Sequence, residues 1–316
     1  MGYVFALSAA LLFGLNGSVT KVIIGAGLEP AQLTLFRVGG TAVIAAVVLL
    51  FANRAAFRVT WRQLCVLLIL GVVGVAMLQF TYAVAISILP IGITLLIEYT
   101  AVLMVAIIAF FFLHEKVRAR LWVAIGFVLI GLAVVAQIWA SELVPFGVLM
   151  AFSAAVCLAT YFLIGEREVG KTSPMAVAFW TMAASTIFWL VFSGWWNINP
   201  AIFATPVSLS ANLAQIQLPL IVPLIWNVLL GSFLPFLLSL FALKHLTATA
   251  AGVVASAEVI FAFIIAWLWL GEGLNTLQIV GATVVLAGII LAQTARVNKV
   301  VDADLAITAD STSSLV

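Results

Sequence analysis

The sequence has few charged residues: Asp, Glu, Lys and Arg make up 8% of its 316 residues, whereas 66% are hydrophobic. Soluble globular proteins carry about 25% charged residues, so we expect no separate soluble domain. The formal net charge of +2 is too small to indicate nucleic-acid binding. Cysteine is also scarce. Cys65 and Cys157 both fall in apolar runs and form neither a disulfide framework nor a metal site.

The motifs of several catalytic classes are absent as well. No Walker A sequence is present, which excludes an ATP-driven engine within this chain. No cluster of His and Cys has metal-ligand spacing, and His114 and His245 are too far apart in sequence to indicate a pair. No Ser, His and Asp grouping points to an intramembrane hydrolase. We therefore expect no cofactor, no metal and no enzymatic activity.

What the sequence does contain is a series of long apolar runs. Each is roughly 20 residues long, the length that crosses a hydrocarbon core of about 30 Å as a helix. Barrel strands would be polar at every second position, and these runs are not, so helices are expected. The ten predicted spans cover residues 3–23, 31–51, 63–85, 91–113, 121–140, 146–165, 174–194, 223–243, 249–270 and 276–295.

The fourth and fifth runs recur as the ninth and tenth. Residues 102–131 align with residues 259–288 at a constant offset of 157, with ten of 30 positions identical. Many of these matches are aliphatic, but Glu115 and Glu272 also align, as do Gly131 and Gly288. An odd number of spans per copy places the second copy upside down in the bilayer. Inverted repeats of this kind are typical of secondary transporters.

The predicted fold is therefore an all-α membrane protein with ten transmembrane helices arranged as two inverted five-helix repeats. The first repeat is expected over residues 1–140 and the second over residues 141–295, followed by a disordered cytoplasmic tail over residues 296–316. The segment 195–222 carries no formal charge, and we expect it to lie along the membrane interface with Trp195 and Trp196 at headgroup depth.

The basic residues predict the orientation of the chain. Eleven of the thirteen Lys and Arg residues fall in the loops after spans two, four, six and eight or in the tail. The opposite loops contain only Lys21, and Arg37 lies inside a span. Because basic loops remain in the cytoplasm, both termini are expected to be cytoplasmic.

Three formal charges lie clearly inside predicted spans, away from their ends: Arg37, Glu98 and Glu258. Placing a charge at the centre of a bilayer costs about 2.5–3.5 kcal/mol on insertion scales, so such residues usually face the bundle interior and have a function. Glu98 and Glu258 would bind a proton or a substrate amine, and Arg37 would balance charge or bind a carboxylate. The alternatives are structural: a hydrogen bond to a neighbouring helix, wetting at the surface, or pairing of Arg37 with Glu29 or Glu98.

Several uncharged polar or aromatic residues inside the spans are candidates for lining a transport path. Each is alternatively a partner in a helix–helix hydrogen bond or an aromatic residue of the interfacial belt. As a set they would let a mostly apolar cavity bind a small amphipathic solute. They are Asn16, Gln79, Tyr82, Tyr161, Trp180 and Asn227.

Several motifs together resemble the EamA-type branch of the drug/metabolite transporter superfamily. They are Ala10-Leu-Leu-Phe-Gly-Leu-Asn16-Gly in span one, Leu35-Phe36-Arg37 in span two, Ala257-Glu258-Val259 with Gly271-Glu272-Gly273 around span nine, and Gly281 with Gly288 in span ten. The run Leu96-Ile97-Glu98-Tyr99-Thr100-Ala101 is most similar to the bacterial threonine/homoserine exporters of that branch. Many members have a proline after the acid in spans four and nine, and this sequence has none there.

The resemblance implies a bacterial inner-membrane exporter of small amino acids or related metabolites, working by alternating access. It also implies a central cavity formed mainly by spans 1, 3, 4, 6, 8 and 9. Proton antiport, uniport and facilitated diffusion stay open, as does the choice between monomer and homodimer. Two alternatives also stay open: a multidrug exporter of lipophilic cations, and a membrane assembly or signalling protein without transport activity.

Overall fold

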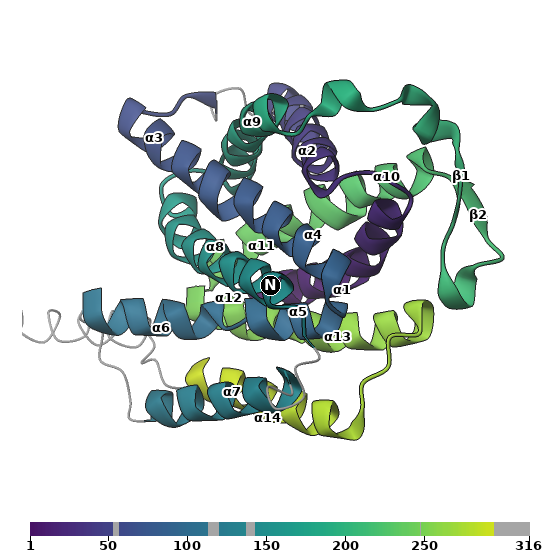
Figure 1. The fold of residues 1–316 in the computed structure, drawn as a ribbon. Coiled ribbons are helices and arrows are strands. Elements are labelled where there is room, and N and C mark those ends of the chain that lie inside the picture. Colours follow the sequence, from purple (N-terminus) through teal and green to yellow (C-terminus); the bar gives the residue numbers. More distant parts are fainter. Residues whose placement is uncertain (53–56, 113–119, 137–142, 247, 294–316) are drawn as a thin grey trace, which may run out of the picture.

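The computed structural model of the protein is almost entirely helical (Figure 1). It describes residues 1–52, 57–112, 120–136, 143–246 and 248–293. The first half of the chain contains α1 (Gly2–Gly25), α2 (Pro30–Ala52), α3 (Trp61–Ile69), the π-helical segment η2 (Leu70–Met77), α4 (Leu78–Ile88), α5 (Ile91–Glu98), α6 (Ala101–Phe112) and α7 (Arg120–Ala136).

The second half begins with two long helices and continues through a short irregular region into a further series of helices. Its elements are α8 (Pro145–Val169), α9 (Pro174–Phe192), the 3-10 turns η3 (Trp195–Asn197), η4 (Pro200–Ala204) and η5 (Ala211–Leu213), the strands β1 (Pro206–Ser208) and β2 (Gln217–Pro219), α10 (Ile221–Val228), the π-helical η6 (Leu229–Phe233), α11 (Leu234–His245), α12 (Ala248–Ala255), α13 (Ala257–Ile265), the π-helical η7 (Ala266–Leu270) and α14 (Thr276–Gln293).

Six continuous helical runs within the described residues are long and apolar enough to cross a membrane. They are Gly2–Gly25, Pro30–Phe51, Trp61–Ile88, Pro145–Val169, Pro174–Phe192 and Ile221–His245. Shorter apolar helices lie where the other predicted spans were placed. The prediction of a mostly helical chain with several helices able to cross a membrane is confirmed, whereas the ten spans and the inverted repeats stay predictions. The predicted tail over residues 296–316, like Glu115, lies outside the described residues.

Proline and serine fix where several of these helices begin. Proline at the first turn is tolerated because the N–H it lacks would have no partner within the helix. This is the position of Pro145 in α8 and Pro174 in α9. The Ser173 hydroxyl caps α9 by accepting a hydrogen bond from the Ala176 N–H at 3.2 Å. The chain therefore enters both helices at well-defined residues.

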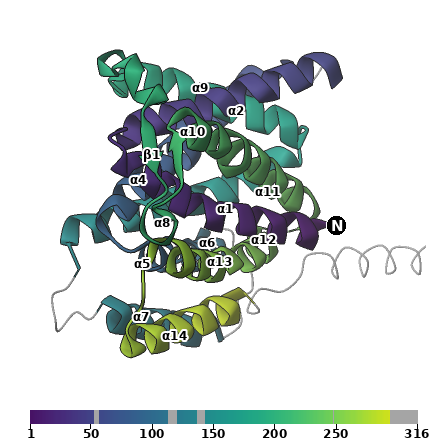
Figure 2. The same cartoon turned by 90° about the vertical axis from the view of Figure 1, so that its right-hand side faces the viewer.

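Helices from the two halves of the chain pack against each other. Helix α1 contacts α11 and α13, and α8 contacts α4 and α5. Helix α2 lies along α9, and α7 lies along α14. Both views show α7 and α14 as a separate layer beside the rest of the bundle (Figures 1 and 2). The centre of the molecule is thus built from α1, α4, α5, α8, α11 and α13, contributed by both halves.

The glycine pair found in the sequence repeat lies in the contact between α7 and α14. A Cβ atom on Gly131 would lie 2.7 Å from Val285 Cγ2, and one on Gly288 would lie 2.8 Å from Val128 Cγ2. Val128 and Val285 are themselves 157 residues apart. The two contacts are therefore equivalent under the repeat: Gly131 packs against Val285, and Gly288 packs against Val128.

Two helical runs are interrupted near their middle, and the interruptions keep the same spacing. Helix α5 ends at Glu98 and α6 begins at Ala101, whereas α12 ends at Ala255 and α13 begins at Ala257. Helices α5 and α12 are both eight residues long and begin 157 residues apart. No proline is needed for the first interruption, because the Thr100 hydroxyl donates to the Ile97 carbonyl at 2.7 Å and competes with the helical hydrogen bonds.

The charge-free segment folds into 3-10 turns and a small hairpin in which β1 and β2 pair antiparallel, with Val207 opposite Leu218. The Trp269 indole N–H donates to the Leu209 carbonyl at 2.6 Å, which ties the hairpin to η7. Figure 2 shows this hairpin at the end of α1 opposite the N-terminus. We refer to that end of the bundle as the hairpin end. The interfacial position of this segment stays a prediction.

Candidate functional site

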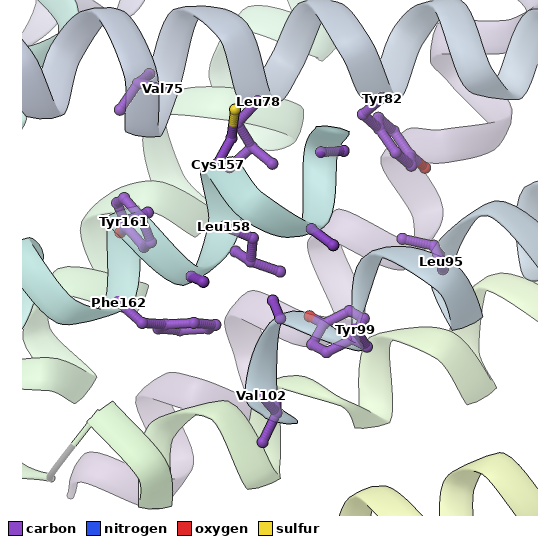
Figure 3. Packing of buried hydrophobic residues seen from close by; sticks show 14 of the residues in the cluster. Val75, Leu78, Tyr82, Leu95, Tyr99, Val102, Cys157, Leu158, Tyr161 and Phe162 are labelled. Carbon is purple, nitrogen blue, oxygen red and sulfur yellow. The ribbon is translucent and has the colours of Figure 1, made fainter. Parts of the chain in front are cut away.

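A cavity lies in the centre of the bundle, between helices of both halves. Including its open mouth, it holds about 770 Å3 of space free of protein atoms. Most of its lining is apolar or aromatic, and Figure 3 shows Tyr82, Tyr99, Tyr161 and Phe162 among the residues packed in this region. The lining residues are Ala6, Ala9, Ala10, Phe13, Asn16, Arg37, Leu78, Gln79, Tyr82, Glu98, Tyr99, Leu158, Tyr161, Phe162, Phe236, Ser239, Ala242, Ala251, Ala255 and Glu258.

The cavity extends towards the end of the bundle where the N-terminus lies. Its lining from α1 comes from the first two thirds of that helix, and its lining from α11 reaches Ala242, near that helix's end. A Cβ atom on Gly2 would contact His245 and Leu246 at 2.9 and 2.8 Å, so the two ends meet there. The lining therefore reaches further towards the N-terminal end of the bundle than towards the opposite end.

The cavity brings together seven of the nine side chains singled out in the sequence. They are Asn16, Arg37, Gln79, Tyr82, Glu98, Tyr161 and Glu258. The resemblance implied a lining from spans 1, 3, 4, 6, 8 and 9, and each of these contributes. The structure adds span two through Arg37, and α7 and α14 contribute no lining residue.

Glu98 and Glu258 lie beside the two helix interruptions. Glu98 is the last residue of α5, only 7% exposed, and its Oε2 atom has no hydrogen-bond partner within the described part of the chain. Glu258 lies in the first turn of α13 and accepts a hydrogen bond from the Tyr99 hydroxyl at 2.7 Å. An anion is favoured at a helix N-terminus, so α13 and Tyr99 both stabilise the Glu258 carboxylate.

Arg37 reaches the cavity from α2 and is buried, with 3% of its surface exposed. Its Nη2 atom donates to the backbone carbonyl of Gly231 at 3.1 Å. Gly231 lies in η6, where the wider π-helical turn disturbs the regular pattern of backbone hydrogen bonds. Within the described residues, Arg37 Nε and Nη1 have no partner, so two donor positions of a buried cation remain available.

Gln79 and Tyr82 add further polar atoms without partners. Both side chains come from α4 and are buried, at 3% and 8% exposure. Neither the amide of Gln79 nor the hydroxyl of Tyr82 has a hydrogen-bond partner in the part of the chain that the structure describes. Buried polar groups are nearly always satisfied, so these atoms require water or a bound solute.

Asn16 lines the cavity and is held from behind by Asn227. The Asn227 amide donates to Asn16 Oδ1 at 2.7 Å and to the Thr20 hydroxyl at 3.0 Å. Asn227 itself does not line the cavity. Trp180 lies outside it too, packed edge-on against Phe179 with ring centroids 5.2 Å apart. The structure therefore does not gather these last two candidates with the other seven.

The aromatic wall of the cavity is formed by Tyr161 together with residues that the sequence reasoning missed. The Tyr161 hydroxyl donates to the Ser239 hydroxyl at 3.3 Å, and its ring packs edge-on against Phe236 at 5.8 Å. Phe236 also contacts Phe13 at 5.0 Å. The repeat offset offered a signal for two of these residues, because Ser239 is 157 residues after Tyr82 and Phe236 is 157 after Gln79.

Glu272, which marks the end of the ninth predicted span, lies outside the cavity. One of its carboxylate oxygens binds Lys21, and the other accepts a hydrogen bond from the Ile91 N–H at 2.9 Å. It therefore caps the start of α5, a helix distant in sequence, rather than the helix that follows it. The start of α14 is instead capped by Asn275, whose side chain accepts from the Gln278 N–H at 2.8 Å.

Comparison with known proteins places this arrangement in a family. The family model described as the EamA-like transporter family matches the chain twice, over residues 1–137 and over residues 145–294. The chain belongs to the EamA-like transporter family. The two matches divide this EamA-family protein close to the boundary that the internal repeat predicts. It is accordingly a multi-pass membrane protein of a family that transports small molecules.

Two relatives are similar along much of their length. The uncharacterized transporter YdfC of Bacillus subtilis is 26% identical over 298 residues, which cover 90% of this chain and 89% of the relative. The threonine/homoserine exporter RhtA of Salmonella typhimurium is 26% identical over 219 residues, covering 66% of this chain and 65% of the exporter. Both relatives therefore belong to the same transporter superfamily as this EamA-family chain.

A solved crystal structure supports the fold. It superimposes on the chain with a TM-score of 0.65 at 15% sequence identity, and the match covers 92% of this chain and 96% of the other. At this identity the likeness concerns the fold alone. The helical arrangement around the cavity therefore has an experimentally solved counterpart.

Proposed function

We propose that this protein is a secondary transporter that exports small amino acids or related metabolites across the bacterial inner membrane by alternating access. One observation carries the proposal: the central cavity gathers two carboxylates, a guanidinium and several buried polar atoms without partners. Such groups are costly in a membrane protein unless they serve a solute or an ion. The relative named a threonine/homoserine exporter agrees with the proposed substrate class.

The proposed architecture is ten spans arranged as two inverted five-helix repeats, over residues 1–140 and 141–295. Supporting it are the double family match, the equal spacing of the helix interruptions and the reciprocal glycine contacts of α7 and α14. An inverted repeat offers two similar conformations of one site, each open to a different side of the membrane. By the distribution of basic residues, both termini are cytoplasmic and the hairpin end is periplasmic.

A zwitterion matches the charges that face the cavity. An amine would be bound by Glu98 or Glu258, and a carboxylate would be bound by the free N–H groups of Arg37. Gln79 and Tyr82 offer further hydrogen bonds to a hydroxyl or to either end of the solute. A carboxylate that gives up its amine ligand on one side of the membrane is able to return protonated, which would couple export to proton entry.

A second candidate is the export of lipophilic cations. The aromatic wall formed by Phe13, Tyr161 and Phe236 favours this alternative, because a cation binds to aromatic faces. Arg37 weighs against it, since a buried guanidinium in the same cavity repels a cationic solute. The presence of one cation and two acids therefore fits an amino acid better than a simple cation.

The proposal is tested first by the excreted metabolites. The medium of a strain that overexpresses the protein is compared with that of a deletion strain, and we expect small amino acids to be enriched. Uptake of the enriched compounds into inside-out vesicles is then measured for the wild type and for Glu258→Gln. If the overexpressing strain exports only added cationic dyes and no amino acids, the second candidate is favoured. Liposomes that move nothing across a broad metabolite panel would favour a role without transport.

A further inference from the structure

Two polar contacts of Glu272 join distant parts of the chain at the hairpin end. Glu272 follows η7, Lys21 lies in the last two turns of α1, and Ile91 begins α5. One oxygen of the Glu272 carboxylate binds the Lys21 ammonium, and the other accepts from the Ile91 N–H at 2.9 Å. The two charged side chains are 17% and 32% exposed, so the ion pair is only partly screened by solvent.

The local sequence explains why Glu272 points back into the bundle. Gly271 ends η7 in the left-handed conformation, with φ at +68°, a geometry that glycine adopts without strain. The Glu272 N–H then donates to the Ala266 carbonyl at 3.2 Å, which completes the turn. The carboxylate is thereby directed to the N-terminus of α5, where the helix dipole favours a negative charge.

Within the described residues, side chains fill the space between the helices around these contacts. A Cβ atom on Gly92 would lie 1.9 Å from the ring of Phe263, so this ring from α13 packs directly on the backbone of α5. A Cβ atom on Gly17 would lie 2.7 Å from the Tyr82 hydroxyl and 3.0 Å from Ile91. A solute leaves the cavity in this direction only if α5 separates from α1 and α13.

The same contacts link the two acids of the cavity. Helix α5 starts at Ile91 and ends with Glu98, whereas Glu258 lies in the first turn of α13, whose continuation η7 leads to Glu272. Fixing Glu272 to Ile91 therefore fixes the helix that carries one acid relative to the helix that carries the other. Glu272 is in this sense a positioning residue, since it lies outside the cavity and acts through two helices.

We propose that Glu272, with Lys21 and the Ile91 N–H, forms a latch that holds the hairpin end closed and must break each time the cavity opens there. The inference rests on the alternating-access function proposed above, and it names the contact on which one half of that cycle depends. The latch joins residues of the first repeat to a residue of the second. Breaking it therefore favours the conformation open at the hairpin end.

The test measures access to a buried reporter from the hairpin side. Thr94 is fully buried on α5 and shares a helical face with Ile91 and Glu98, so it lies between the latch and the cavity. Thr94→Cys is introduced into a Cys65→Ala/Cys157→Ala background. The labelling rate with a membrane-impermeant maleimide is then compared in right-side-out and inside-out vesicles.

Three variants remove different contacts of the latch and are expected to differ in the size of the effect on labelling. Glu272→Gln keeps an acceptor for the Ile91 N–H and loses the charge. Lys21→Met loses the ion pair and the 3.5 Å hydrogen bond from the Lys21 ammonium to the Leu89 carbonyl, and Glu272→Ala loses both contacts of Glu272. Lys171→Met is the matched control, because Lys171 pairs with Glu168 within one helix-end segment and joins no two helices of different halves. Labelling from the hairpin side is expected to rise about tenfold in Glu272→Ala, or about 1.4 kcal/mol, and by less in the other two variants.

The outcomes separate the latch from the proposed function. Labelling that is unchanged in all three latch variants, or that rises equally in Lys171→Met, overturns the latch even if amino acids are transported. Labelling that rises most in Glu272→Ala and less in the other two variants supports the latch. If no solute then crosses the membrane in any variant, the proposed function alone is wrong. Should Glu272→Ala fail to assemble, judged by size-exclusion chromatography, the comparison of Lys21→Met with Lys171→Met decides the question.

Discussion

The tight packing of Asn16 against the backbone of Gly231 predicts that Gly231→Ala impairs the protein. Gly231 lies in η6, its carbonyl accepts the hydrogen bond from Arg37, and an added Cβ would lie 1.9 Å from Asn16 Oδ1. Real Cβ atoms do not approach so closely. Either Asn16 rotates away or the π-helical turn shifts and moves the carbonyl that holds Arg37.

Both responses are costly. Rotation of Asn16 breaks the 2.7 Å hydrogen bond from Asn227, and leaving such a buried group unpaired costs about 1–3 kcal/mol. A shifted backbone costs a similar amount, since overpacking typically destabilises by about 1–3 kcal/mol. A loss of this size corresponds to roughly 5-fold to 150-fold in the population of the competent state. We expect transport into inside-out vesicles to fall within that range.

The assay pairs transport with thermal stability, measured by fluorescence-detected size-exclusion chromatography. Gly126→Ala is the control, because a Cβ atom there would meet nothing within 4 Å. The double variant Gly231→Ala/Asn16→Ala removes the clash but also the acceptor of the Asn227 hydrogen bond, so it is expected to recover stability only in part. If Gly231→Ala matches Gly126→Ala in both stability and transport, the assignment of this contact and of the Arg37 anchor is refuted.

Three further predictions follow from single contacts. Tyr99→Phe removes the hydroxyl that donates to Glu258, and a lost hydrogen bond to a charged group is worth about 1.5–3 kcal/mol. Vesicle transport is therefore expected to fall at least tenfold, and an unchanged rate would contradict the pairing. Arg37→Met is expected to abolish the preference for amino acids over the corresponding amines without a carboxylate, measured by competition; a preserved preference would exclude carboxylate binding by Arg37. Gly131→Leu is expected to lower the thermal midpoint by forcing Val285 away, and a midpoint equal to that of the wild type would contradict the tight packing of α7 on α14.

Much of the fold was predictable because membrane helices are long, apolar and nearly uniform in length. Within the described residues, each predicted span coincides with a helix or a series of helices. The interior breaks were not predicted. No proline closely follows Glu98 or Glu258 to mark them. The interruption at Thr100 arises from a local side-chain hydrogen bond that apolar periodicity does not reveal.

Part of the site was predictable for a related reason. Charged and amide groups are expensive within a bilayer, so Arg37, Glu98 and Gln79 stood out against their apolar neighbours and do face the cavity. The same signal also selected Asn227, which satisfies a helix–helix hydrogen bond instead. Sequence alone does not distinguish these two uses of a buried amide, because the partner lies more than 200 residues away.

Some contacts depend on backbone geometry that no sequence pattern announces. Arg37 donates a hydrogen bond to a backbone carbonyl in a π-helical turn. Every residue has such a carbonyl, so the sequence does not indicate which one is free to accept. The cap on α5 comes from Glu272, which is 181 residues away in the sequence. Both required the packing of the two halves to be known.

The central claim is that the cavity binds a zwitterion through its acids and Arg37. Counterflow of radiolabelled threonine in proteoliposomes tests it most directly, with the wild type compared with Glu98→Gln, Glu258→Gln and Arg37→Met. Small amino acids are predicted to drive exchange in the wild type, and each substitution is predicted to reduce it at least tenfold. Exchange that is driven equally well by lipophilic cations, or that survives all three substitutions unchanged, would contradict the account.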